Sequence, residues 1–291
     1  MNRMRCILIA ATLLLGMGWA HGATMEQMRF HCADDTTRLN ELLAQGYAQT
    51  TRNPNELVYF YAQQLLGTPY VAHTLEGDSE RLTINIHELD CTTFVETLYA
   101  LARTTMQERY SWRDYARNLE NLRYRDGAMT DYSSRLHYIS EWIMNNHSRG
   151  NLMEVTADLP HVQYQVKSID FMTTHASNYH SLKNDSAMVA RIAHFERGYR
   201  NHRMPVLKKS WLGAKDVRAA IRTGDFVGLV TRIEGLDISH LGILVKDEKG
   251  DIYLLDASMS GGQVMLEPMP LVRQLEGYKN NTGVRVFRIM P

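Results

Sequence analysis

Apolar residues recur with two different periods along this chain. A spacing of three or four residues is typical of amphipathic helices, and it predicts helices over residues 35–45, 55–66, 91–102, 112–122, 135–144 and 186–199. Alternating or β-rich runs are typical of strands, and they predict strands over residues 82–86, 151–170, 225–231, 240–246, 251–255 and 284–289. Because helices precede an antiparallel run of strands, we expect an α+β fold in which a long helix packs on a sheet.

The same change of pattern divides the chain into segments. Residues 24–105 contain the first helices and the helix that begins at Cys91, and residues 216–291 contain the antiparallel strands. Residues 106–215 lie between them and are polar and rich in aromatic side chains. We interpret this middle segment as an insertion, mainly helical, that contributes to substrate recognition.

Residues 1–23 have the organisation of a secretory signal peptide. Arg3 and Arg5 supply a charged start, residues 7–17 an apolar stretch, and residues 18–20 (Gly-Trp-Ala) a small-x-small cleavage site. Cleavage after Ala23 is the alternative. The apolar stretch is too short to cross a bilayer, so we expect an exported, soluble protein of about 270 residues. Its location would be periplasmic or extracellular.

Charge narrows the range of partners. Lysine plus arginine and aspartate plus glutamate each number 32, so the formal net charge is +0. A neutral chain offers no basic surface for nucleic acid or anionic lipid. We therefore expect no nucleic-acid partner and no integral membrane contact, and we expect a monomer.

Two cysteines, Cys32 and Cys91, remain after the predicted signal peptide. A disulfide between them is the structural alternative in an oxidising compartment. Their settings differ, however, because Cys32 lies in a polar N-terminal segment and Cys91 at the predicted start of a helix. We favour two free thiols, and the sequence assigns no role to Cys32.

Cys91 has the setting of a nucleophile. Strand-like alternation ends at Ile86, and apolar residues then recur at helical spacing after position 91. Asp90 is a good N-cap, which places Cys91 at the first helical position. The helix dipole and the free amides there favour a thiolate.

A thiolate nucleophile needs a base, and the base needs a group that orients it. His240 opens an apolar strand, and Asp256 closes the next strand. If the two strands form a hairpin around Lys249 and Gly250, both side chains lie at its open end, within reach of each other. Alone, His240 could be an ordinary surface or hydrogen-bonded histidine, and Asp256 could be a turn former. Only their combination with Cys91 predicts a catalytic triad.

Five stretches of sequence carry a family resemblance: residues 67–70 (Gly-Thr-Pro-Tyr), 85–96 (Asn-Ile-His-Glu-Leu-Asp-Cys-Thr-Thr-Phe-Val-Glu), 135–138 (Arg-Leu-His-Tyr), 235–243 (Gly-Leu-Asp-Ile-Ser-His-Leu-Gly-Ile) and 255–258 (Leu-Asp-Ala-Ser). In their order and spacing the chain resembles the DUF1460 family of N-acetylmuramoyl-L-alanine amidase-like proteins, within the NlpC/P60 superfamily of papain-like cysteine hydrolases. The resemblance covers nearly all of the chain after the signal peptide. Peptidases of the superfamily commonly have Ser-Gly after the nucleophile, whereas Thr92 and Thr93 follow it here.

The resemblance implies an activity and roles for individual residues. It implies hydrolysis of the amide between the lactyl group of N-acetylmuramic acid and L-Ala, in peptidoglycan or its turnover fragments. Cys91 would attack the carbonyl, His240 would act as base and then acid, and Asp256 would orient His240. Tyr70 matches a tyrosine that often reaches the site in this superfamily, where it would stabilise the oxyanion with the Cys91 N–H. A packed turn aromatic is the alternative for Tyr70.

Arg135 and Tyr138 are candidate substrate-binding residues. Three positions apart on a predicted helix, they would share one face, and an arginine fork suits a substrate carboxylate. The alternative is an ordinary solvated helix face.

Other functions are less well supported by the sequence. We expect no metal and no cofactor, because no His-Glu-x-x-His motif or paired-cysteine spacing occurs, and His175 and His180 are five residues apart. A γ-D-glutamyl-diamino-acid endopeptidase is the alternative enzyme. A catalytically inactive module that binds the cell wall is the alternative from another class.

Overall fold

The computed structural model describes residues 22–291, so the predicted signal peptide lies almost entirely outside the described residues. The helices are α1 (Asp35–Tyr47), α2 (Pro54–Gln64), α3 (Cys91–Met106), α4 (Trp112–Arg123), α5 (Ile139–Ser148), α6 (Phe171–Thr174), α7 (Ser186–Glu196), α8 (Lys215–Ala220) and α9 (Leu271–Glu276). The strands are β1 (Met28–Phe30), β2 (Leu82–Ile84), β3 (Leu152–Glu154), β4 (Gln163–Lys167), β5 (His202–Lys208), β6 (Phe226–Thr231), β7 (Ile238–Lys246), β8 (Ile252–Ser258), β9 (Gln263–Leu266) and β10 (Asn281–Ile289).

One eight-stranded sheet organises the molecule. Its strands follow the order β4-β5-β10-β6-β7-β8-β9, with β3 also paired to β10, and every pairing is antiparallel. A separate two-stranded parallel sheet joins β1 to β2. The predicted α+β class, with helices and an antiparallel sheet, is confirmed.

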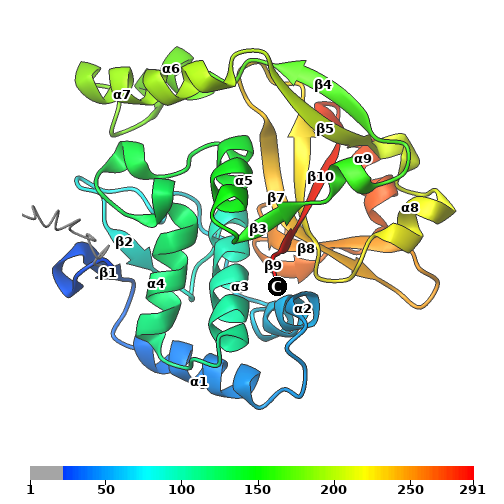
Figure 1. Cartoon of the computed structure of the whole chain (residues 1–291), viewed down its shortest axis with the longest axis horizontal. Helices are drawn as coiled ribbons and strands as arrows, with labels where there is room; N and C mark the ends of the chain where they lie inside the picture. The colour runs from blue at the N-terminus through cyan, green and yellow to red at the C-terminus, as the bar shows by residue number, and fades with distance from the viewer. Residues whose placement is uncertain (1–21) are drawn as a thin grey trace, which may run out of the picture.

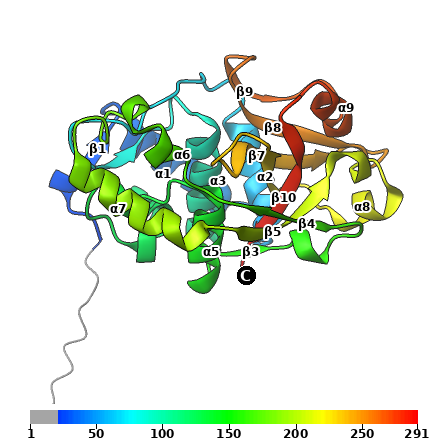
Figure 2. The same cartoon turned by 90° about the horizontal axis from the view of Figure 1, so that it is seen from above.

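Helices flank the sheet on two sides. Figure 1 shows α1, α3, α4 and α5 gathered beside it, with α8 and α9 beyond the opposite side, and the view from above in Figure 2 also separates α1, α3 and α5 from α8 and α9. One buried cluster includes Leu98 of α3 and Phe226 of β6. A second includes Leu244 of β7, Val217 of α8 and Leu275 of α9. Burial of apolar side chains in the first cluster fixes α3 against the sheet, and burial in the second packs α8 and α9 against the sheet.

The middle segment is more closely joined to the sheet than its sequence indicates. Residues 106–215 supply α4 to α7, in accord with the predicted helices, but they also supply β3, β4 and β5. The predicted strand over residues 151–170 is two short strands separated by a 3₁₀ turn. No helix among residues 22–291 has the length and apolar character needed to cross a membrane.

The helix predicted over residues 135–144 begins later than expected. Arg135 is extended, with φ −66° and ψ 137°, and Tyr138 is the extended N-cap of α5, which starts at Ile139. A 3₁₀ turn over residues 132–134, capped by Asp131, precedes Arg135. The prediction that Arg135 and Tyr138 share one face of a helix is therefore wrong.

Candidate active site

The start of α3 is fixed by its own capping residues. The Asp90 side chain accepts a hydrogen bond from the Thr93 N–H at 2.8 Å, and the Thr93 hydroxyl accepts one from the Asp90 N–H at 2.9 Å. This reciprocal capping box confirms the prediction that Asp90 is the cap and Cys91 the first helical residue. The Cys91 N–H consequently has no acceptor within the helix and is available to a bound anion.

The predicted hairpin is present. β7 and β8 pair antiparallel, with Ile243 opposite Leu255, and they are joined by a turn in which Gly250 has φ +77°. Its open end brings His240 to Asp256, and the Nε2 of His240 donates a hydrogen bond to that carboxylate. The Asp256 side chain is 3% exposed and the His240 side chain 22% exposed. The imidazole is thus held from its buried side.

Helix and hairpin bring Cys91 to His240. α3 packs against β7 and β8, and Cys91 lies close enough to the His240 ring to raise its pKa. Burial lowers the pKa of His240, but the hydrogen bond to Asp256 and the nearby Cys91 and Asp256 outweigh it and raise the pKa to about 10. Because Asp256 engages Nε2, Nδ1 is the nitrogen left for the sulfur. Both described cysteines, Cys32 and Cys91, are free thiols.

Tyr70 lies near Cys91. The Leu89 N–H donates to the Pro69 carbonyl at 3.0 Å, and the Tyr70 N–H donates to the Gly262 carbonyl at 2.8 Å, so this segment is held between the start of α3 and the β8–β9 turn. Burial raises the pKa of Tyr70, and the negative charges of Cys91 and Asp90 raise it further. The Tyr70 phenol therefore keeps its proton at neutral pH.

A small pocket opens next to Cys91. It has a volume of about 170 Å³ and is lined by His73, Leu75, Glu76, Asp90, Thr92, Glu96, Arg135, Leu136 and His137. Glu96 is held by a buried ion pair with Arg123 at 2.7 Å. Burial and the charge of Arg135 lower the pKa of His137 to about 3, so its imidazole is neutral. The pocket is polar, as a site for a sugar or peptide group would be.

The structure gives Arg135 and Tyr138 other partners than the sequence predicts. Arg135, a residue 7% exposed, donates through its guanidinium to Glu80 at 2.6 and 3.0 Å and to Glu76 at 2.7 Å. Tyr138, a residue 5% exposed, donates through its hydroxyl to Glu196 at 2.8 Å. Glutamate side chains of the protein thus already accept the hydrogen bonds of both residues. We therefore do not propose Arg135 or Tyr138 as ligands of the substrate.

Gly242 is a residue of the site that the sequence analysis left without a role. A Cβ at Gly242 would lie 2.8 Å from the Leu255 carbonyl oxygen and 3.0 Å from the Asp256 Cβ. Because Gly242 has no side chain, Asp256 can occupy the space beside it and reach His240. The His-x-Gly spacing was visible in the sequence, but the clearance depends on the strand across from it.

We expect Gly242→Ala to lower kcat by about 10- to 100-fold, because displacing Asp256 misorients His240. Overpacking should also destabilise the fold by about 1–3 kcal/mol. Turnover and denaturant unfolding measure the two effects. Gly213→Ala is the matched control, since nothing lies within 4 Å of its added Cβ. Equal kcat values for the two variants would contradict this role.

Activity should fall as the pH rises through about 10, because the raised pKa of His240 keeps its imidazolium intact below that value. The same shift stabilises the folded state fully below pH 6.5, and this contribution is lost as the pH rises through about 10. Asp256→Asn removes a cause of the rise, so the alkaline limb of its kcat/KM profile should lie at lower pH. An unmoved limb would show that another group sets it.

Comparison with known proteins places the chain in a family. A cysteine at a helix start near a histidine–carboxylate hairpin is an arrangement that can supply nucleophilic catalysis. The profile of the N-acetylmuramoyl-L-alanine amidase-like family matches residues 61–283. The chain belongs to this family of amidase-like hydrolases. A search of curated proteins gives no match.

Solved structures agree with this assignment. An N-acetylmuramoyl-L-alanine amidase from Bacteroides uniformis is 34% identical, with a TM-score of 0.77, over 82% of this chain and 99% of the amidase. A Bacteroides fragilis protein described as a candidate xylanase is 41% identical, with a TM-score of 0.74, over 79% of this chain and 99% of that protein. A DUF1460 protein from Legionella pneumophila shares the fold at 17% identity, with a TM-score of 0.67, over 88% and 94% of the two chains.

Proposed function

We propose that this chain is a cysteine amidase with an NlpC/P60 papain-like core, and that it hydrolyses the bond between N-acetylmuramic acid and L-Ala. The observation that carries the proposal is the convergence of three groups. Cys91, at a free helix N-terminus, lies close enough to the His240 ring to raise its pKa, and this ring hydrogen-bonds with the buried Asp256. The family supplies the substrate class.

The chemistry would proceed in two stages. The Cys91 sulfur attacks the lactyl carbonyl, and the oxyanion that forms is stabilised by the Cys91 N–H and the Tyr70 hydroxyl. His240 then gives its proton to the amine of L-Ala as the C–N bond breaks, which leaves a thioester. Neutral His240 next takes a proton from water, whose oxygen attacks the thioester. The products are the lactyl carboxylate, the free peptide and the original cysteine.

Each supporting residue has one task in this scheme. Asp256 holds Nε2 of the imidazole, so that Nδ1 faces the sulfur. The pKa of His240, raised to about 10, keeps the proton that the leaving amine requires at neutral pH. An imidazolium beside the sulfur is also the partner that a thiolate nucleophile requires.

The site does not favour the activity suggested by the xylanase description of one related structure. Glycoside hydrolases use two carboxyl groups on either side of the scissile bond. Here a thiol faces an imidazole, and Asp256 is engaged with that imidazole. We therefore propose amide hydrolysis, with the stem-peptide endopeptidase as the alternative outcome of the test.

Mass spectrometry of the products from a purified muropeptide tests the proposal. An amidase releases an intact peptide beginning with L-Ala and leaves a sugar with a free lactyl carboxylate. An endopeptidase would leave L-Ala-D-Glu on the sugar. An inactive wall-binding module would give no product, as Cys91→Ala should. Export to the periplasm or the outside of the cell, where peptidoglycan is found, is part of the proposal.

A further inference from the structure

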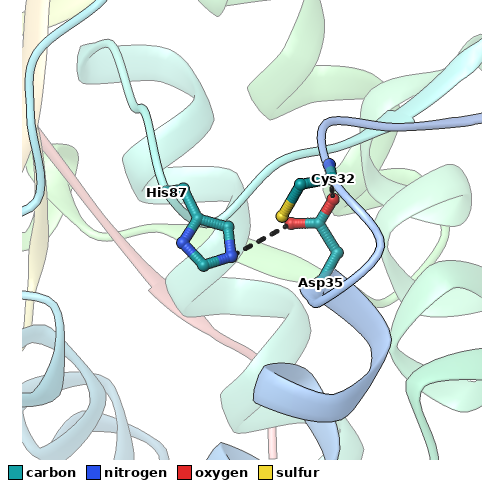
Figure 3. Close-up of side chains that lie close together, drawn as sticks. All are labelled: Cys32, Asp35 and His87. Carbon is teal, nitrogen blue, oxygen red and sulfur yellow. Dashed lines mark hydrogen bonds and ion pairs between the residues drawn. The ribbon is translucent and has the colours of Figure 1, made fainter.

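Cys32, Asp35 and His87 converge at a second site (Figure 3). Cys32 follows β1, Asp35 begins α1, and His87 lies in the loop between β2 and α3. One sulfur, one carboxylate oxygen and one ring nitrogen from these residues all lie within 4.8 Å of one another. Within the described part of the chain this is the one group of three such side chains at this spacing.

Two atoms of this cluster are buried without hydrogen-bond partners. The Asp35 side chain is 0% exposed, and its Oδ1 accepts no hydrogen bond. The Nε2 of His87 is also buried and makes no hydrogen bond. The two atoms are 3.6 Å apart, which is an ion-pair contact if His87 is protonated (the dashed line in Figure 3) but is longer than a hydrogen bond. A buried carboxylate oxygen in this state is costly unless a cation compensates it.

The donor set suits zinc. Thiolate, imidazole and carboxylate are the three ligand types of protein zinc sites, and a sulfur ligand disfavours Mg²⁺ and Ca²⁺. The second oxygen of Asp35, Oδ2, accepts the Cys32 N–H at 2.9 Å, and this outer hydrogen bond fixes the carboxylate. Zinc ligands stand about 3.2–3.8 Å apart at bonds of about 2.0–2.3 Å. The partly exposed Cys32 and His87 would move inward by about 1 Å.

We propose that Cys32, Asp35 and His87 bind one Zn²⁺ ion, with water in the fourth position. The ion fastens the N-terminal segment to the loop that leads into α3. The side chain of Asn85 already holds this loop, accepting the His87 N–H at 3.0 Å, and Cys91 follows four residues after His87. The site is thus a structural clamp close in sequence to the nucleophile, and it does not depend on the proposed reaction.

Metal titration of the purified, chelator-treated protein tests this site. We expect one equivalent of Zn²⁺, and with Co²⁺ a near-ultraviolet charge-transfer band from the thiolate. Cys32→Ser should abolish the band and weaken zinc binding by more than about 100-fold, the upper range for losing an outer-shell partner alone. Cys91→Ser is the matched control and should keep both, which excludes binding at the Cys91–His240 pair.

A second pair of variants keeps the test decisive if Cys32→Ser folds poorly. His87→Gln should weaken zinc binding to a similar extent, while His180→Gln, which replaces an exposed histidine paired with Asp78, should not. Zinc should raise the Tm of the unmodified chain and of His180→Gln, but not of His87→Gln. No stoichiometric binding, or a cobalt band that is lost with Cys91 and kept without Cys32, would overturn the proposal.

Discussion

Replacing Cys91 with alanine is expected to abolish muropeptide hydrolysis and to leave the fold intact. Loss of a nucleophile that acts as a unit with its base costs about 10⁴- to 10⁶-fold in kcat. The start of α3 is held by the Asp90–Thr93 capping box and not by the thiol. The free energy of unfolding should therefore change by only about 0.5 kcal/mol. Product analysis by mass spectrometry and thermal unfolding measure the two quantities.

Alkylation of the unmodified protein gives an independent control. Iodoacetamide at neutral pH should label Cys91 quickly, and peptide mapping separates this site from Cys32. Alkylation at Cys91 should stop turnover in proportion to labelling. Substantial activity in Cys91→Ala, or in protein fully alkylated at position 91, would refute the cysteine mechanism.

His240→Ala is expected to abolish turnover nearly as completely as Cys91→Ala, but it should also destabilise the protein. The Asp256 carboxylate is 3% exposed, and its other oxygen, Oδ1, has no hydrogen-bond partner. Removal of the imidazole leaves this buried charge unpaired, at a cost of about 1–3 kcal/mol. The partial exposure of His240, taken alone, would predict a smaller loss of stability. Denaturant unfolding measures the loss.

The double variant His240→Ala/Asp256→Asn separates stability from catalysis. A neutral amide at position 256 removes the unpaired charge, so the double variant should recover part of the lost stability and stay inactive. Asp256→Asn alone should be milder than His240→Ala, because the imidazole is still present; the loss of the carboxylate charge should cost up to about 10⁴-fold in kcat. Equal inactivity of Asp256→Asn and His240→Ala would assign Asp256 more than an orienting role.

Local sequence predicts the two halves of the site correctly. The N-cap preference of Asp90, the helical period after Cys91 and the turn at Lys249-Gly250 depend on neighbours only a few residues away. The structure confirms the helix that starts at Cys91 and the β7–β8 hairpin. The start of α7 is a further local feature, because the Asp185 side chain caps it by accepting the Met188 N–H.

Where the sequence interpretation fails, the deciding partner is distant in the chain. From its sequence context, Arg135 is expected on a helix with its guanidinium free to bind a carboxylate of the substrate. In the structure Glu76 and Glu80, more than fifty residues earlier, accept its hydrogen bonds. The ring of Tyr138 is buried, and its hydroxyl donates to Glu196. Hydrophobic periodicity describes one element at a time, and it carries no information about such pairs.

The sequence by itself determined the α+β class, the helix-start cysteine and the histidine–aspartate hairpin, because each follows from short-range backbone preferences. Only the tertiary structure decided that α3 meets β7 and β8 at Cys91 and His240, that Gly242 leaves room for Asp256, and that Cys32 and Asp35 meet His87. These contacts join segments whose ends are brought together by packing of the common core. Their geometry depends on every element between them, and no local pattern records it.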